Sequence, residues 1–176
     1  MSDRTPNPWA PWALLLAALL AGCGPTRNQF APPCPGQAIL GNAADFDSYR
    51  GGARDLTDLV LRGRIVGLQG SCREGDRKDQ LAVTVQVGVE LTRGPAMAGR
   101  ETDVPVFVAV TEGETILDKR TVTMHVVFPS NVERVTLTPG EFNLVLPVSR
   151  AKSGAAYTIL AGFQLTPDQA GPTRRP

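Results

Sequence analysis

Residues 81–92 read LAVTVQVGVELT, and their pattern indicates the fold class. Every second position carries a large aliphatic side chain, from Leu81 through four valines to Leu91, and small or polar residues stand between them. Successive side chains of a β-strand point to opposite faces, whereas a helix would scatter these six around its axis. The pattern therefore predicts a strand with one buried and one solvated face.

The same period of two recurs along the rest of the chain. It is found in residues 104–110, 122–128, 135–137, 142–148 and 157–165. Glycines and prolines separate these stretches, and the Glu-Gly-Glu of residues 112–114 is typical of a hairpin turn. In residues 59–72 the alternation changes phase after Ile65, which predicts a β-bulge at Gly67.

About seven short strands suit an antiparallel β-sandwich, whose two inner faces bury the alternating valines and leucines. The strand number, the Thr-Pro-Gly turn at residues 138–140 and the strand that begins at Tyr157 resemble immunoglobulin-like and fibronectin type III-like domains. This resemblance covers about residues 37–167 and implies only the architecture. A closed β-barrel would present the same alternation and is the alternative.

The composition limits the classes of function. The chain has 176 residues with 18 Lys and Arg against 17 Asp and Glu, so nothing in its net charge of +1 points to nucleic acid. Hydrophobic residues make up 42% of the chain, which is enough for one globular domain with a buried core.

The first 23 residues predict an export signal. A polar start with Arg4 precedes an apolar run from Ala13 to Ala21, and small Gly22 follows. The run of nine residues is about half of the roughly 20 that a helix needs to cross a bilayer. We therefore expect residues 1–22 to be removed as a signal peptide rather than retained as a transmembrane helix.

Four consecutive residues resemble the lipobox of bacterial lipoproteins: Leu20, Ala21, Gly22 and Cys23. The resemblance implies cleavage before Cys23, a diacylglyceryl thioether on its sulfur and acylation of the new amino terminus, with chains such as palmitate. Three acyl chains would anchor the protein stably, because each buried methylene adds about 0.8 kcal/mol. Gly24, where Asp commonly marks retention at the inner membrane, favours the outer membrane and a domain facing the periplasm. The alternatives are the periplasmic side of the inner membrane and an ordinary signal peptide with a chance cysteine.

The two remaining cysteines, Cys34 and Cys72, predict a disulfide. An even pair of cysteines in an oxidising compartment generally bonds, and closing this loop would stabilise the fold by about 4 kcal/mol in the chain-entropy model. A zinc site is a poor alternative, because two cysteines and the sole histidine, His125, give too few ligands. We expect neither a metal nor a cofactor.

The chain divides into four parts. Residues 1–22 are the signal peptide, and residues 23–36 carry the lipidated cysteine and a proline-rich tether. Residues 37–167 form the β-sandwich domain, and residues 168–176 are expected to be a flexible tail.

Residue types suited to catalysis are few. His125 stands in the polar phase of its strand, which predicts solvent exposure, and no Gly-x-Ser-x-Gly motif offers it a serine. Asp45 and Asp47 have the spacing of a calcium loop, but the residues needed at its later positions are missing. Glu112 and Glu114 flank the expected turn and are interpreted as solvated. No catalytic residue is assigned.

Two apolar residues break the alternation. Phe107 and Val127 stand in the otherwise polar phase of neighbouring strands, which predicts a second packed layer; an apolar contact patch is the alternative. Residues 73–79 mix both signs of charge and predict a solvated hairpin loop.

These patterns favour a lipid-anchored cell-envelope protein with a non-catalytic structural or protein-interaction role. A sandwich presents loops and strand edges to a partner without any titratable cluster, so an envelope protein is the expected partner, besides the membrane. A periplasmic carrier of a lipid or other small ligand is the alternative and needs a cavity between the sheets. A hydrolase is a third class and needs serine, aspartate and histidine to converge.

Overall fold

The structure is a computed structural model that describes residues 33–51, 54–166 and 169. The predictions for the signal peptide, for the lipobox with Cys23 and for residues 170–176 lie outside the described residues. Within those residues, no helix has the length and hydrophobicity to span a membrane.

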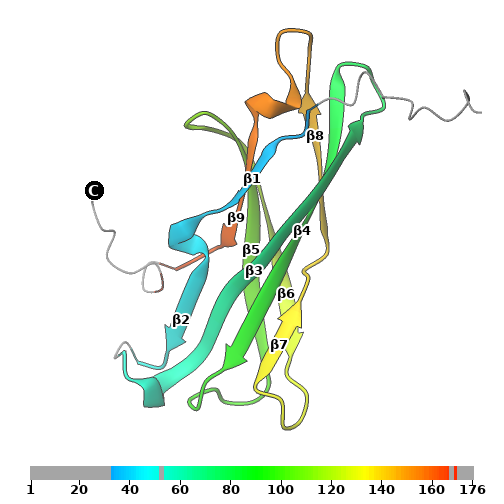
Figure 1. The fold of residues 1–176 in the computed structure, drawn as a ribbon. Coiled ribbons are helices and arrows are strands. Elements are labelled where there is room, and N and C mark those ends of the chain that lie inside the picture. Colours follow the sequence, from blue (N-terminus) through cyan, green and yellow to red (C-terminus); the bar gives the residue numbers. More distant parts are fainter. Residues whose placement is uncertain (1–32, 52–53, 167–168, 170–176) are drawn as a thin grey trace, which may run out of the picture. The chain divides into compact units, whose positions relative to one another are not determined.

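The described chain forms two β-sheets packed on each other (Figure 1). The strands are β1 (Gly36–Ile39), β2 (Asp45–Tyr49), β3 (Leu59–Glu74), β4 (Gln80–Arg93), β5 (Glu101–Glu112), β6 (Thr115–Val127), β7 (Arg134–Leu137), β8 (Glu141–Pro147) and β9 (Thr158–Phe163). Three short 3-10 turns accompany them: η2 (Gly41–Ala43), η3 (Leu56–Asp58) and η4 (Gly154–Ala156). The predicted sandwich is confirmed, and the alternative of a closed barrel is wrong for the described residues.

The strand order separates the two long hairpins. The first sheet has the order β1-β9-β5-β6, and the second has the order β2-β3-β4, with both β7 and β8 paired to the far side of β4. The pairing of β1 with β9 is parallel, and the other pairings are antiparallel. The hairpin β3–β4 therefore belongs to one sheet and the hairpin β5–β6 to the other.

β4 provides the centre of the core. Its apolar row from Leu81 to Leu91 is 0–2% exposed, as the alternation predicts. These side chains pack in one cluster with the inner rows of β5 and β9, including Val106 and Ile159. Burial of each such side chain stabilises the fold by about 1.5–3 kcal/mol, so this row dominates the packing of the two sheets.

The predicted bulge in β3 is confirmed. The pairing with β4 shifts register between Ile65 and Gly67, which leaves Val66 without an opposite residue and half exposed. The shift lets Leu61 and Ile65 face the core before the bulge, and Leu68 pack against it afterwards. One extra residue thus accommodates the change of phase seen in the sequence.

The chain changes sheets between β1 and β2. β1 pairs with β9, η2 follows, and β2 then pairs with β3 of the other sheet. Leu40 and Ala43 at this crossing cover Phe107 on the outer face of the first sheet. The second packed layer is therefore confirmed for Phe107, but it is wrong for Val127, which is 53% exposed because the crossing segment covers β5 and β9 and leaves β6 open.

Candidate functional site

The predicted disulfide between Cys34 and Cys72 is present, with 5.8 Å between the two Cα atoms. Cys34 lies two residues before the start of β1 of the first sheet, and Cys72 lies on β3 of the second. The bond therefore joins the two sheets at a margin where β1 and β3 are not hydrogen-bonded to each other. The side chain of Gln37 lies so close over Gly70 that a Cβ there would collide with it, so the two strands are packed tightly beside the bond.

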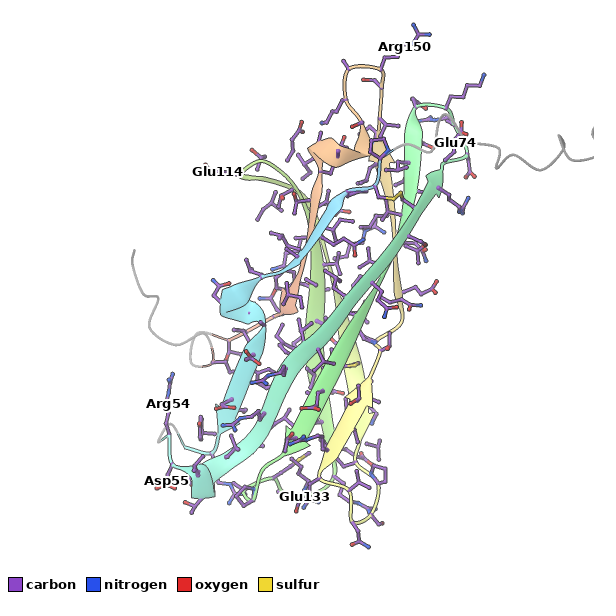
Figure 2. The ribbon with its side chains drawn as sticks, viewed as in Figure 1. Arg54, Asp55, Glu74, Glu114, Glu133 and Arg150 are labelled. Carbon is purple, nitrogen blue, oxygen red and sulfur yellow. A yellow bond between two sulfur atoms is a disulfide. The ribbon has the colours of Figure 1, made fainter. Side chains whose placement is uncertain are left out.

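Several loops meet at this end of the sandwich, which we call the disulfide end. The Lys152 ammonium lies 2.6 Å from a carboxylate oxygen of Glu112 and 4.6 Å from the centre of the Tyr157 ring. Buried Gly154 packs against the carbonyl of Pro33. Figure 2 shows Glu74, Glu114 and Arg150 at this end, and Arg54, Asp55 and Glu133 at the opposite end.

The hairpin turn at residues 112–114 forms as predicted, with Gly113 at a φ of 57°. Glu112 is less free than the sequence interpretation suggested, because it accepts a hydrogen bond from Lys152. This contact raises the pKa of the Lys152 ammonium above its usual value. The turn and the loop after β8 are thereby linked by an ion pair.

A row of paired charges crosses the outer face of the second sheet, and we call it the charge belt. Its members are Asp45 and Asp47 of β2, Arg62 and Arg64 of β3, Glu90 of β4 and Arg134 of β7. Its sign alternates from strand to strand. Opposite charges on neighbouring strands stabilise the pairing of those strands. The belt therefore adds to the stabilisation that the backbone hydrogen bonds of the sheet provide.

The geometry of the belt is most regular at β2. Both guanidinium donors of Arg62 reach the Asp47 carboxylate, with N–O distances of 2.6 and 2.9 Å, and Arg64 donates to Asp45 at 2.8 Å. The hydrogen bond from Arg62 lowers the pKa of Asp47, while partial burial opposes that shift. The calcium-loop spacing of Asp45 and Asp47 thus has another explanation, because both carboxylates bind arginine.

The described structure has open hollows on its surface and a small one between the sheets. A hollow of about 400 Å³ lies over β2 and is lined mainly by Asp45, Asp47, Arg62 and Arg64, whose charges already pair with each other. A second hollow of about 100 Å³ lies between the sheets beside Phe163. This inner hollow is smaller than the roughly 300–1,000 Å³ of ordinary small-molecule sites.

His125 is exposed, as predicted, with 62% of its side chain accessible. Its Nδ1 atom lies 2.8 Å from an Asp103 carboxylate oxygen, directly across the β5–β6 pair. The sequence pattern did not predict Asp103 as the partner of His125, although both residues stand in the polar phase of their strands. Among the described residues, no hydroxyl group is hydrogen-bonded to the Nε2 atom of His125. The described residues also contain no group of three or more His, Cys, Asp or Glu side chains that could hold a metal ion.

Edge strand β6 carries features that oppose further strand pairing. Residues 115–123 of edge strand β6 are exposed, yet Asp118 and Arg120 stand opposite core-facing Val110 and Val108. Inward-pointing charges of this kind disfavour the docking of another strand. Arg120 also donates to the carbonyl of Asn143 on β8 at 2.7 Å, so it occupies an acceptor at the edge of the other sheet.

No protein-family model, curated protein or solved structure matches this chain. The chain has three cysteines, and two of them form the disulfide, which leaves the thiol of Cys23 as the remaining one.

Proposed function

We propose that the protein is a bacterial lipoprotein with a non-catalytic structural or protein-interaction role in the cell envelope. Its signal peptide is removed before Cys23, lipid is attached to that residue, and the immunoglobulin-like sandwich faces the periplasm from the outer membrane. The observation that carries the proposal is the pairing of Cys34 with Cys72, which leaves a single unpaired cysteine, and that cysteine ends a Leu-Ala-Gly-Cys sequence.

The proposed location is supported by the disulfide. Disulfides persist in oxidising compartments such as the periplasm and are rare in the cytosol, where thiols are kept reduced. A bond that joins the segment before β1 to β3 also fits a chain that is held by its amino-terminal side, because force on the anchor would otherwise act directly on β1.

The structural role is supported by the way the charged groups are arranged. The charge belt and the Asp103–His125 pair are engaged across neighbouring strands, as in a surface that stabilises a sheet. Because the inward charges of β6 oppose strand addition, we expect a protein partner to bind elsewhere than at the edge of β6. Chemical crosslinking in intact envelopes is expected to recover the same protein partner repeatedly, and repeated recovery of none would contradict a protein-interaction role.

Metabolic labelling tests the anchor. Cells that express the full chain and receive labelled palmitate are expected to yield a labelled protein that fractionates with membranes. The Cys23→Ser variant should lose the label and retain its signal peptide. The matched control replaces Cys34 and Cys72 together with serine and should keep the label. An unlabelled parent protein, or a Cys23→Ser variant that matures as before, would refute the proposal.

A further inference from the structure

Two neighbouring apolar side chains project from the start of β6. Ile116 is 64% exposed and Leu117 is 48% exposed. They lie at an irregularity of the β5–β6 pairing, where Asp118 pairs with Val110 but Ile116 pairs with Thr111. Leu117 is thus the extra residue of a bulge, a feature that often redirects side chains at a sheet edge.

The hairpin that carries this pair belongs to the disulfide end. Glu112 at its turn is bonded to Lys152, and Gly154, two residues further on, packs against the carbonyl of Pro33. Pro33 adjoins the disulfide-bonded Cys34, at the start of the described part of the domain. Figure 2 shows Glu114 of the same turn toward the end of the sandwich that carries Glu74 and away from the end that carries Asp55.

The length of the tether decides which end of the domain reaches the membrane. From Cys23 to Cys34 there are 34 − 23 = 11 residues, which span at most about 40 Å when fully extended. Along β3, the 72 − 59 = 13 residues from Leu59 to Cys72 cover about 43 Å at roughly 3.3 Å each. An anchor at Cys23 therefore lets the disulfide end touch the bilayer, whereas contact through the opposite end needs a span slightly longer than the fully extended tether.

We propose that Ile116 and Leu117 dock onto the lipid bilayer that holds the anchor, at the boundary between headgroups and acyl chains. This inference rests on the proposed lipidation of Cys23. It identifies the disulfide end as the membrane-facing end and leaves the opposite end, with η3, for the periplasm.

The charges of the disulfide end indicate that the contact is apolar. Residues 73–79, 112–114 and 150–152 together carry five basic and five acidic side chains, so these three loops give no net attraction to anionic headgroups. Amphipathic surfaces bind bilayers through burial of apolar area and through attraction between charges. For Ile116 and Leu117 the contribution comes from burial of apolar area. The contact should therefore persist at high salt, which screens charges but not apolar burial.

A single tryptophan tests this inference, because the chain's two tryptophans, Trp9 and Trp12, precede Cys23. The Ile116→Trp variant would be expressed as the full chain, purified in its lipidated form and placed in phosphatidylcholine vesicles with or without brominated acyl chains. Bromine quenches tryptophan only at close range. The matched control is Leu56→Trp in η3, an equally exposed position (68%) beside Asp55 at the opposite end.

We expect brominated vesicles to reduce the emission of Ile116→Trp and to leave that of Leu56→Trp unchanged, in low and in high salt alike. Leu117→Trp repeats the test if Ile116→Trp does not fold, as judged by circular dichroism. Equal emission in both vesicle types would overturn the inference. A blue shift that instead requires an added envelope protein would also overturn it, in favour of a protein occupant.

The mass of the purified protein separates this inference from the proposed function. A mature chain that carries acyl groups but shows no quenching at residue 116 or 117 would refute membrane docking and leave the lipoprotein proposal intact. A mature chain without acyl groups would refute both.

Discussion

β4 and β6 carry the same alternating pattern but differ in how far they are buried. In β4 the entire row from Leu81 to Leu91 is buried, because β3 flanks one side, β7 and β8 flank the other, and the first sheet covers the inner face. In β6, which has a neighbour on one side only, exposure rises from 1% at Val126 to 38% at Val122. Alternation fixes the face that a side chain takes, whereas the strand's place in the sheet decides whether that face is covered.

The same difference explains the chemistry of the two strands. The inner row of β4 contains only aliphatic side chains, while the inner row of β6 continues from Val122 to Arg120 and Asp118. A charge is tolerated there because solvent reaches it and because Arg120 finds both Asp118 and the carbonyl of Asn143. β6 thus has a long exposed edge whose charges disfavour the docking of another strand.

The largest expected effect on stability comes from introducing an aspartate into the inner row of each strand, β4 and β6, in separate variants. Val87→Asp would bury a carboxylate at a site with 0% exposure and should cost about 5 kcal/mol of folding free energy. Val122→Asp should cost about 1 kcal/mol or less, because its carboxylate remains hydrated. Urea unfolding of the two variants measures both values. Similar losses would show that the inner rows of β4 and β6 are equally covered.

The disulfide is expected to matter nearly as much. Replacement of Cys34 and Cys72 by serine should lower the free energy of unfolding by about 4 kcal/mol, from the chain entropy of the opened loop. Amide exchange should increase most in β1, whose four residues are exposed and whose strand partner is β9, and least in the centre of β4.

Cys23→Ser is the control for this measurement, because it should leave unfolding of the sandwich unchanged. A double variant as stable as the parent protein would contradict a structural role for the bond.

Removal of the inward charges of β6 is expected to have a smaller effect on stability but a clear effect on association. The double variant Asp118→Thr with Arg120→Val should change the unfolding free energy by about 1 kcal/mol or less, because both positions are exposed. It should form dimers or larger species in analytical ultracentrifugation, since the charges that oppose strand pairing are gone.

The matched control for β6 is Asp79→Thr with Arg77→Val, which removes an exposed ion pair from a hairpin loop. It should stay in the same association state as the parent. If the β6 variant behaves in the same way, its charges do not protect the edge.

The smallest effect concerns the charge belt. Because the folded-state pKa of Asp47 lies below its ordinary value of 3.8, ionised Asp47 stabilises the fold fully above that value, and the stabilisation is lost as pH falls through the lowered pKa. Asp47→Asn should therefore cost at most about 1 kcal/mol at neutral pH and nothing once the pH is well below 3.8.

Urea unfolding across pH 3–7 (about the range in which carboxylates titrate) checks this prediction. Asp76→Asn in the hairpin loop serves as the control and should leave stability unchanged. A cost of Asp47→Asn that grows as the pH falls would contradict the assigned sign.

Local patterns predicted β3 to β9, the bulge at Gly67 and the turn at Gly113, because each depends on the conformation of a few neighbouring residues. They did not predict the short strands β1 and β2, whose residues are mostly exposed or charged. The disulfide was predictable because, with Cys23 assigned to lipid, only Cys34 and Cys72 remained. Strand order was not predictable, since the parallel pairing of β1 with β9 joins residues more than 100 positions apart.

The charge belt was missed for the same reason. The spacing of Asp45 and Asp47 suggested a failed calcium loop, while the partners Arg62 and Arg64 lie 15 and 19 positions away on another strand. Val127 was misassigned because the alternation alone does not show where a covering segment ends.

Lipidation of Cys23 can be read from the intact mass of the protein extracted from its own membranes. We expect a chain that begins at Cys23 and is heavier than residues 23–176 by a diacylglyceryl group and one further acyl chain, with Cys34 and Cys72 oxidised. A chain that begins elsewhere, or one that begins at Cys23 without added lipid, would contradict it.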